Sequence, residues 1–181
     1  MALETFNFDP SHSQVAFSAR HLMISKVSGL FKVWSGTLII DEADYTASRV
    51  TAEIDAASID SKEEQRDTHL RSADFLDTAQ YPAITFASTS VEKLSDDHFK
   101  VAGSLSIHGV TKPVVLDTDF FGRQKDPWGD ERAGFSAKTS INRKEFGLSF
   151  NLPLEGGGWL VGDKVEITLD VQAVKEIKAA A

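Results

Sequence analysis

The five histidines are the first side chains to consider for chemistry, because imidazole can hold a metal or move a proton near neutral pH. They are scattered along the chain, with no H-E-x-x-H motif and no close pair, so the sequence predicts neither a metal site nor a bound cofactor. His21 falls on the apolar face of an alternating segment. It is either an interior histidine whose hydrogen bonds are made within the protein or a polar contact to a molecule bound inside the fold.

The densest cluster of functional side chains is Arg66-Asp67 with His69-Leu70. On a helix, Arg66 and His69 would share one face, because residues three positions apart are neighbours there. The two interpretations are an ordinary solvated surface and a polar network beside a bound head group. A further arginine, in Asn142-Arg143-Lys144-Glu145-Phe146-Gly147-Leu148, lies at a strand end beside a Phe-Gly turn, where a structural role is favoured over a catalytic one.

Motifs of nucleophilic and nucleotide-dependent enzymes are missing. The chain has no cysteine, which excludes a thiol nucleophile, a disulfide framework and a thiolate zinc site. It has no G-x-S-x-G; residues 38–44 resemble an acidic magnesium-binding motif, but no phosphate loop accompanies them, and residues 155–159 have glycines without the lysine. We therefore expect a protein that is not an enzyme. The alternative is a small barrel hydrolase or isomerase that uses His21 or the Arg66-Asp67-His69 cluster on a lipid-like substrate.

The composition also bears on partners and location. Acidic residues outnumber basic ones by 27 to 19, and the formal charge of −8 repels nucleic acid. No stretch approaches ~18 apolar residues, so no stable membrane insertion is expected. Residues 1–9 lack a basic start followed by an apolar run, which favours a cytoplasmic location. A chain whose leader had been removed, and which was therefore periplasmic or secreted, would have the same sequence.

The elements that must position these side chains are mostly strands. Residues 97–121 alternate in hydropathy around a turn at residues 108–111 and predict a β-hairpin. Across residues 27–40 the alternation slips in phase by one position, which indicates a β-bulge within a long strand. Ser61, placed before Glu64 as in a capping box, predicts a helical segment over residues 61–77. The same strand period predicts further strands in residues 12–24, 49–59, 84–91, 132–141 and 164–174.

About eight strands, without an internal repeat or linker, predict a single all-β domain over residues 1–181. We expect an extended antiparallel barrel of about eight strands, with one short helical segment that caps one mouth. The alternative is a two-sheet sandwich with a dry core. Small residues on the alternating face are expected to leave space inside the barrel: Ala19, Gly29, Gly36, Ala52, Gly103, Ala137 and Thr139.

Several motifs follow one another along residues 6–174: His12-x-x-Val15-x-Phe17-x-x-x-His21, Val27-x-Gly29-x-Phe31-x-x-Trp34-x-Gly36, Ser58-Ile59, Arg66-Asp67-x-His69-Leu70, Asp74-Phe75, Tyr81-Pro82-x-Ile84-x-Phe86-x-Ser88-Thr89, Gly103-x-Leu105-x-Ile107-x-Gly109-Val110-Thr111-Lys112 and Asn142-Arg143-x-x-Phe146-Gly147-Leu148. In order and spacing they resemble the YceI-like family. Trp34, usually Phe in that family, and Ser106, where Thr is common, are mild departures. The resemblance implies a lipocalin-like, eight-stranded barrel that binds, stores or transports a long isoprenoid or other acyl-chain amphiphile, and it alone suggests a homodimer. Gly29-Leu30-Phe31 lacks the tryptophan of the G-x-W motif of true lipocalins, so only the architecture is shared with them.

The ligand expected from this resemblance is a single polyisoprenoid, such as a prenyl quinone or a prenyl phosphate. Its polar head is expected to meet His21, Arg66, His69, Asn142 or Arg143; an arginine could bind a phosphate in bidentate fashion, whereas a quinone carbonyl needs a single donor. The remaining alternative is a stress-related structural protein whose barrel is filled by its own side chains. The tail is expected to lie along apolar positions of the alternating face: Phe17, Ala19, Phe31, Trp34, Ile54, Phe86, Leu105, Phe135, Ala137, Ile167 and Leu169.

Overall fold

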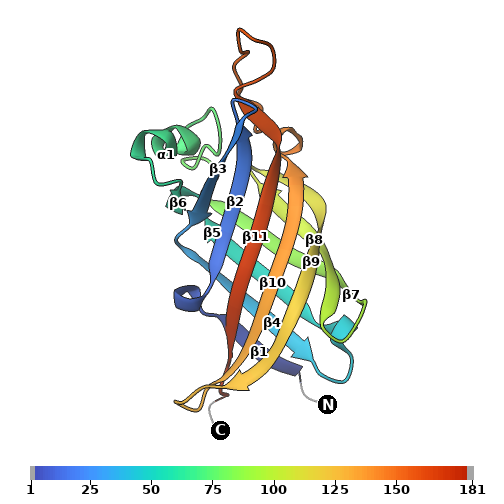
Figure 1. Cartoon of the computed structure of the whole chain (residues 1–181). Helices are drawn as coiled ribbons and strands as arrows, with labels where there is room; N and C mark the ends of the chain where they lie inside the picture. The colour runs from blue at the N-terminus through green and yellow to red at the C-terminus, as the bar shows by residue number, and fades with distance from the viewer. Residues whose placement is uncertain (1–2, 179–181) are drawn as a thin grey trace.

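The computed structural model describes residues 3–178 and consists mainly of strands, with one α-helix, α1, at Glu64–Arg71. Figure 1 shows an elongated barrel with α1 beside one end. Four short 3-10 helices are η1 (Pro10–His12), η2 (Tyr45–Ala47), η3 (Ala56–Ser58) and η4 (Arg143–Phe146). The strands are β1 (Leu3–Phe8), β2 (Gln14–His21), β3 (Ser25–Phe31), β4 (Trp34–Asp41), β5 (Arg49–Asp55), β6 (Ile59–Asp60), β7 (Ala83–Lys93), β8 (His98–Ile107), β9 (Val110–Lys125), β10 (Glu131–Asn142) and β11 (Val161–Lys175).

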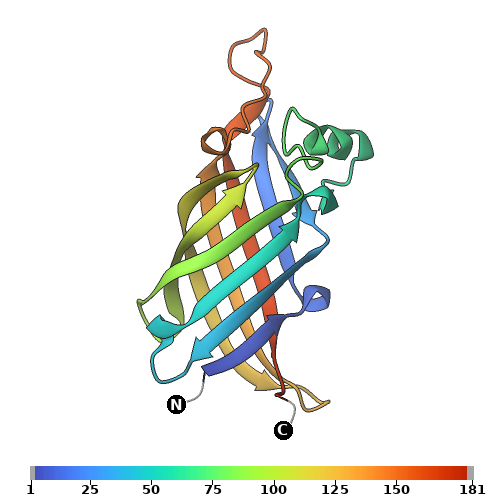
Figure 2. The same ribbon diagram turned by 180° about the vertical axis from the view of Figure 1, so that it is seen from behind.

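An eight-stranded antiparallel barrel forms in the order β1-β4-β5-β7-β8-β9-β10-β11, and it closes where β1 pairs with β11. Strands β2, β3 and β6 continue the sheet from the other part of β11, so they complete the wall toward α1 (Figures 1 and 2). The predicted barrel is therefore confirmed, and the alternative of a two-sheet sandwich is wrong. We call the end that carries α1 and η4 the helix end, and the end that carries η2 and the start of β1 the opposite end.

The predicted hairpin of residues 97–121 is confirmed as β8 and β9, which pair over their whole common length from His98↔Asp119 to Ile107↔Val110. His108 and Gly109 connect them, with φ of 55° and 72°. A two-residue turn with both φ values positive matches the right-handed twist of paired strands, and glycine adopts such a φ without strain.

The predicted β-bulge in residues 27–40 is wrong, because the change of phase marks the end of one strand and the start of another. β3 ends at Phe31 and lies between β2 and β6, whereas β4 begins at Trp34 and lies between β1 and β5. A second change of phase, in residues 49–59, has the same origin, since η3 separates β5 from β6. A one-position slip in the hydrophobic alternation is therefore ambiguous. It can mark a bulge within one strand or a connection between two strands in different parts of the barrel wall.

The helical segment is confirmed within residues 61–77, but its N-cap is Glu63, whose carboxylate accepts from the backbone N–H of Gln65 and Arg66. Ser61 has a different task. Both its backbone N–H and its hydroxyl donate to the buried Asp67 carboxylate, at 2.9 and 2.5 Å. The Ser61–Asp67 contact therefore ties α1 to the segment that follows β6.

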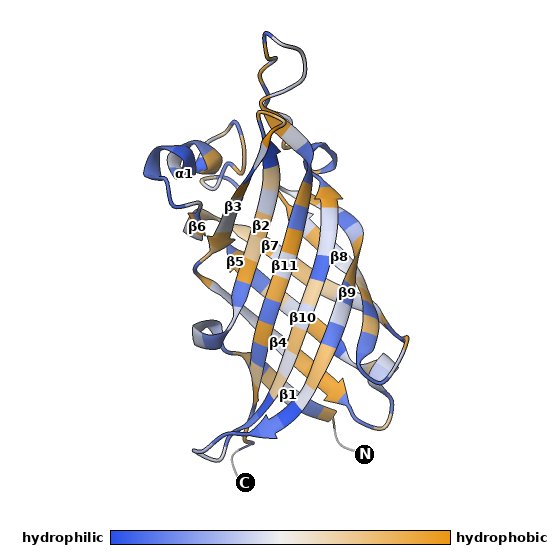
Figure 3. Ribbon diagram, in the orientation of Figure 1, coloured by the Kyte–Doolittle hydropathy of each residue, from blue (hydrophilic) through white to orange (hydrophobic). Residues whose placement is uncertain are grey.

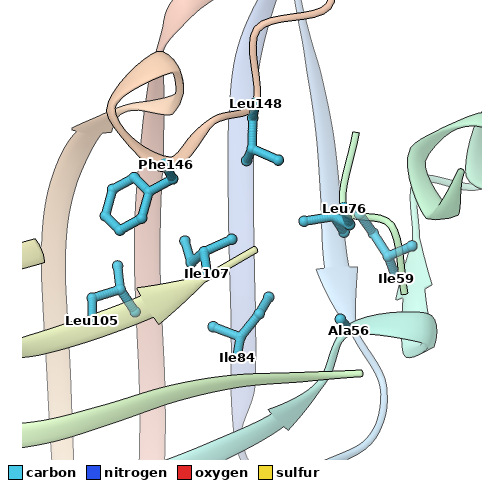
Figure 4. Close-up of a cluster of buried hydrophobic side chains, with 8 residues drawn as sticks. All are labelled: Ala56, Ile59, Leu76, Ile84, Leu105, Ile107, Phe146 and Leu148. Atoms are coloured by element: carbon cyan, nitrogen blue, oxygen red, sulfur yellow. The ribbon is translucent and has the colours of Figure 1, made fainter. Parts of the chain in front are cut away.

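Two groups of buried apolar side chains occupy the two ends of the barrel. Figure 4 shows the helix-end group, in which α1-side residues meet the strand ends and η4. Its members are Ala56, Ile59, Leu76, Ile84, Leu105, Ile107, Phe146 and Leu148. The opposite-end group is Phe6, Ile40, Ala133 and Ala173. The barrel is thus packed at its ends and not uniformly along its axis.

Candidate functional site

The interior of the barrel holds a cavity of about 330 Å³. Its wall is built by the inward positions of the strands, because alternate side chains of each strand point to the same face of the sheet. Almost every lining residue is apolar. The lining residues that carry a polar group are Trp34, Tyr45, Ser48, Arg49, Thr118, Thr139 and Arg143.

Every position predicted to contact the tail lies on this wall. They come from strands on all sides of the barrel: Phe17, Ala19, Phe31, Trp34, Ile54, Phe86, Leu105, Phe135, Ala137, Ile167 and Leu169. Figure 3 shows the alternation of hydrophobic and hydrophilic positions along these strands. That these residues contact a ligand remains a prediction, since the structure tests only their position.

The expectation that glycines on the inward face leave space is wrong at three positions, because an aromatic ring covers each of them. A Cβ built at Gly36 would lie 2.2 Å from the ring of Phe8, and one at Gly103 would lie 2.4 Å from the ring of Phe86. The third pair is Gly29 with Phe17. Large and small residues interdigitate across neighbouring strands in a packed wall. The other predicted small residues do line the cavity: Ala19, Ala52, Ala137 and Thr139.

Several lining residues come from outside the strands that the alternation predicts. Phe8 belongs to β1, whose short segment was not predicted as a strand. Leu70, Phe75 and Leu148 close the helix end from α1, from the turns after it and from the segment after η4. The hydrophobic periodicity of strands cannot predict lining residues that come from a helix, a turn or a loop. Inward residues of the predicted hairpin, such as Val101 and Leu116, could have been added from the alternation alone.

The five predicted head-group residues all lie at the helix end, but the structure does not bring them together on one surface of the cavity. Only Arg143 lines it. His21 is half-buried at the end of β2, in register with Ser25 and Val161. Asn142 is exposed and accepts from the backbone N–H of Lys144, so it acts as the N-cap of η4.

Arg143 is 3% exposed, and its guanidinium is engaged by backbone carbonyls. Nε donates to Gly162 at 2.9 Å, and Nη1 donates to Leu148 and to Phe150, the latter at 2.9 Å. Burial lowers the pKa of Arg143, and the Asp163 carboxylate partly offsets that effect. The side chain therefore joins the segment after η4 to the start of β11, which is the structural role that the sequence favoured.

Arg66 and His69 do not share a partner, although both belong to α1. Arg66 donates from Nε to the Ser61 hydroxyl at 2.7 Å and from Nη2 to the Ser61 carbonyl at 2.6 Å. Nε2 of His69 lies 2.9 Å from Oδ2 of Asp74. Of the two interpretations of this cluster, a polar network is what the geometry shows. Its contact with a head group remains a prediction.

His69 also belongs to an aromatic group at the helix end. The imidazole packs edge-on against the rings of Phe75 and Phe150, with centroid distances of 5.0 and 4.9 Å, and the two phenyl rings are 5.1 Å apart. Phe75 lines the cavity, whereas Phe150 belongs to the long loop that precedes β11. These three rings connect α1, the cavity and that loop.

A network of charged residues covers the opposite end. Arg123 lies over the ring of Phe6, 5.0 Å from its centroid, and pairs with Glu4, Glu42 and Glu131. Burial would lower the pKa of Arg123, but the hydrogen bond and charge of Glu4 raise it above its ordinary value. Hydrogen bonds from Lys175 and Arg123 lower the pKa of Glu4 against the opposing effect of burial. Inside this network, Tyr45 packs against Phe99 and Phe120, and the three rings line the cavity at that end.

Within residues 3–178, no group of histidine and carboxylate side chains is close enough to hold a metal ion. The same part of the chain has no helix long and apolar enough to cross a bilayer. The apolar wall of the interior can bury an apolar molecule, and polar groups are available where the helix end meets water.

Comparison with known proteins agrees with this architecture. A family model described as the YceI-like domain matches residues 6–173. "Protein YceI" of Escherichia coli O17:K52:H18 (strain UMN026 / ExPEC) is 41% identical over 165 residues, which cover 91% of this chain and 83% of that protein.

Two solved structures share the fold. The crystal structure of Burkholderia cenocepacia BcnA is 22% identical with a TM-score of 0.80, and the match covers 91% of this chain and 98% of that one. A polyisoprenoid binding domain from Saccharophagus degradans, implicated in plant cell wall breakdown, is 16% identical with a TM-score of 0.69 and covers 94% and 98% of the two chains.

Proposed function

The chain belongs to the YceI-like family, and from this premise we propose that it binds one long-chain polyisoprenoid inside the barrel and stores or carries it. The observation that carries the proposal is the cavity of about 330 Å³ with an almost wholly apolar wall. The Saccharophagus domain of the same fold, a polyisoprenoid binding domain, supports this class of tail.

Burial of the tail supplies free energy for binding that increases with tail length. Each methylene that leaves water contributes about 0.8 kcal/mol, so roughly ten of them give about 8 kcal/mol. That amount lies within the roughly 4–15 kcal/mol that association costs in lost freedom, so a tail that buries more methylenes is needed to exceed the upper part of that range. Affinity therefore grows with tail length, and the wall does not need to recognise the chemistry of the head.

The head lies at the helix end in this proposal, because the Arg123 network and Tyr45 cover the opposite end. A neutral head such as a quinone suits this end better than a phosphate. To bind a phosphate, Arg143 would have to give up backbone carbonyls that it already holds. A quinone carbonyl needs one donor, which the half-buried His21 can supply.

We propose a binding role without catalysis. Within residues 3–178, neither the His21 nor the His69 imidazole is hydrogen-bonded to a serine or threonine hydroxyl, and the partner of His69 is the carboxylate of Asp74. If the alternative of a hydrolase or isomerase holds, His21→Ala and His69→Ala will abolish a turnover that the unchanged protein performs, while affinity for the substrate survives. In the binding protein, the same changes alter only the preference for the head group.

The first experiment is organic extraction of the purified full chain followed by mass spectrometry. A stoichiometric isoprenoid supports the proposal, and a stoichiometric fatty acid assigns the cavity to another class of lipid. If the extract is empty, the same protein is titrated with menaquinone-4 and, separately, with geranylgeranyl diphosphate. An empty extract together with no binding of either probe would refute the proposal in favour of a filled structural barrel.

Trp34 offers a direct signal for the titration, because its indole lines the cavity and is only 8% exposed. The other two tryptophans, Trp128 and Trp159, are 84% and 54% exposed and can be replaced by phenylalanine. In that background, quinone in the cavity quenches the remaining fluorescence. Palmitate serves as the comparison of tail class, since it fills apolar space but carries no methyl branches.

A further inference from the structure

Two neighbouring loops at the helix end expose large apolar side chains. The β2–β3 turn presents Leu22, Met23 and Ile24, with 39%, 64% and 79% of their surface exposed. The loop before β11 presents Leu152 and Trp159, at 51% and 54%. We call these five side chains the apolar tip. Figure 1 shows the two loops together beyond the barrel, and Figure 3 shows hydrophobic colour at the β2–β3 turn.

Backbone hydrogen bonds within and between its two loops hold the apolar tip in a defined conformation. Leu22 N–H donates to the Leu160 carbonyl at 2.9 Å, and Leu160 N–H donates to the Leu152 carbonyl at 2.9 Å. The side chain of Met23 occupies the space beside Gly158, where a Cβ would lie 2.0 Å from its sulfur. The apolar side chains are thus presented outward from a fixed backbone.

The surroundings of the apolar tip do not share the net negative charge of the whole chain, which is −8. Residues 20–26, which contain the β2–β3 turn, include Arg20 and Lys26 and no acidic residue, and Lys26 pairs with Glu166 at 2.9 Å. The loop of residues 149–160 contains a single acidic residue, Glu155. Apolar side chains with a tryptophan among them and cations behind them are the composition of a surface that binds the interface of an anionic bilayer.

The apolar tip is also continuous with the helix end of the cavity. Val161, the residue after Leu160, lines the cavity. Phe150, in the same loop as Leu152, packs on Phe75, which lines the cavity too. An isoprenoid dissolves in a bilayer and hardly in water, so it must pass between membrane and cavity at a point of contact.

We propose that the apolar tip docks reversibly into the interface of an anionic lipid bilayer and sets the helix end of the cavity against it. The transfer of ligand at this contact rests on the proposed function, but the docking itself does not. The contact is peripheral: the five side chains reach the headgroup and upper acyl region, and the barrel stays outside.

The test is flotation of the full chain with vesicles of phosphatidylethanolamine and phosphatidylglycerol. Trp159→Ala and Ile24→Glu should each weaken vesicle binding by about fivefold or more, because they remove apolar contact or add an anion. Trp128→Ala and Phe121→Glu are the matched controls, since both side chains are exposed and lie outside the apolar tip, and they should float as the unchanged protein does. Vesicles of phosphatidylcholine alone should bind more weakly.

A second readout separates docking from ligand binding. In the background with Trp34 as the remaining tryptophan, phenylalanine keeps an aromatic side chain at position 159 of the apolar tip. There, Ile24→Glu should slow the uptake of menaquinone-4 from vesicles relative to the same background without this change, and leave the quinone affinity in dilute detergent unchanged. If the unchanged protein docks on vesicles but neither it nor its variants bind the quinone, this inference holds and the proposed function is wrong. Equal flotation of Ile24→Glu and the unchanged protein would overturn the inference. So would absence of flotation with a concentration-dependent dimer that Ile24→Glu disrupts, because the apolar tip would then bind a second copy.

Discussion

The ring of Phe17 lies over Gly29, its partner on the neighbouring strand, in the place that a β-carbon would occupy. Phe17↔Gly29 are registered across β2 and β3, and a Cβ on Gly29 would lie 2.5 Å from Cζ of the ring. Phe31, on the same inward face, tilts against Phe17 with 5.6 Å between ring centroids. The place of the missing β-carbon of Gly29 is therefore filled by the Phe17 ring, which packs directly on the backbone there.

Gly29→Ala is expected to force the Phe17 ring away from the wall and toward the cavity. The cost in unfolding free energy should be about 1–3 kcal/mol, the range for overpacking a well-packed interior. Quinone affinity should fall as well, because the displaced ring takes space from the tail. Urea unfolding and the Trp34 quenching titration measure the two effects.

Gly134→Ala is the matched control for this prediction. A Cβ on Gly134 meets its nearest neighbour, in the Phe121 side chain, at 3.7 Å, which is an ordinary contact. Its effect on the unfolding free energy should stay below about 1 kcal/mol. Adding Phe17→Leu to Gly29→Ala should restore part of the lost stability. Equal unfolding midpoints for Gly29→Ala and Gly134→Ala would show that the ring does not constrain residue 29.

Ala137→Leu is expected to fill part of the cavity. Ala137 lines it from the middle of β10, and a leucine there adds three carbons where the tail would lie. We expect binding of menaquinone-4 to weaken by about tenfold or more, which corresponds to about 1.4 kcal/mol. The midpoint of urea unfolding should change little, because added apolar volume enters a space that no side chain fills.

Ala87→Leu is the comparison for Ala137→Leu. Ala87 is exposed on β7, so the same change adds apolar volume outside the barrel. Its quinone affinity should equal that of the unchanged protein. If the two variants bind menaquinone-4 equally well, the ligand does not lie in the cavity.

The sequence predicted what depends on local periodicity. Alternation along β8 and β9 placed Leu105 on the inward face, and the structure has it there. It could not predict features that depend on how distant segments meet. The closure of the barrel through β1 is one of these, because six residues carry too short a pattern. The covering of Gly29 by Phe17 is another, since it depends on strand register.

The polar groups show the same limit. The three-residue spacing of Arg66 and His69 predicted a common face of a helix. Their hydrogen-bond partners, however, are Ser61 before α1 and Asp74 after it. Arg143 was expected at a strand end, and it is there. Its four carbonyl partners belong to residues 148–162 and have no sequence signal at all.

Arg143→Met is expected to destabilise the helix end strongly. The carbonyls of Gly162 and Phe150 would lose their donor while they stay shielded from water, which costs about 2–4 kcal/mol in unfolding free energy. Hydrogen exchange should rise in the loop before β11. Lys144→Met removes a neighbouring charge that is exposed and pairs with Asp163 at 3.2 Å, so it should cost less than about 1 kcal/mol. Equal losses of unfolding free energy in the two variants would show that the carbonyl contacts of Arg143 do not stabilise the helix end.

His98 should make the stability of the chain depend on pH. Its Nδ1 lies 2.8 Å from Asp119 Oδ1, and its Nε2 lies 2.7 Å from Asp117 Oδ1. The hydrogen bond to Asp119 raises the pKa of His98, and the charge of Asp117 raises it further. Desolvation lowers it, but the net effect is a raised pKa. A raised pKa in the folded chain means that folding binds the proton more tightly.

The sign of the pH effect follows from this difference. The stabilisation is fully present below the unfolded pKa of about 6.5 and is lost as the pH rises through the higher folded value. The urea midpoint of the unchanged protein should therefore fall as the pH rises from about 6.5 through the higher folded value, and that of His98→Gln should fall less. Asp119→Asn should flatten the profile in the same way, because it removes the hydrogen bond that holds the proton. A steeper fall in His98→Gln than in the unchanged protein would mean that the proton is bound elsewhere.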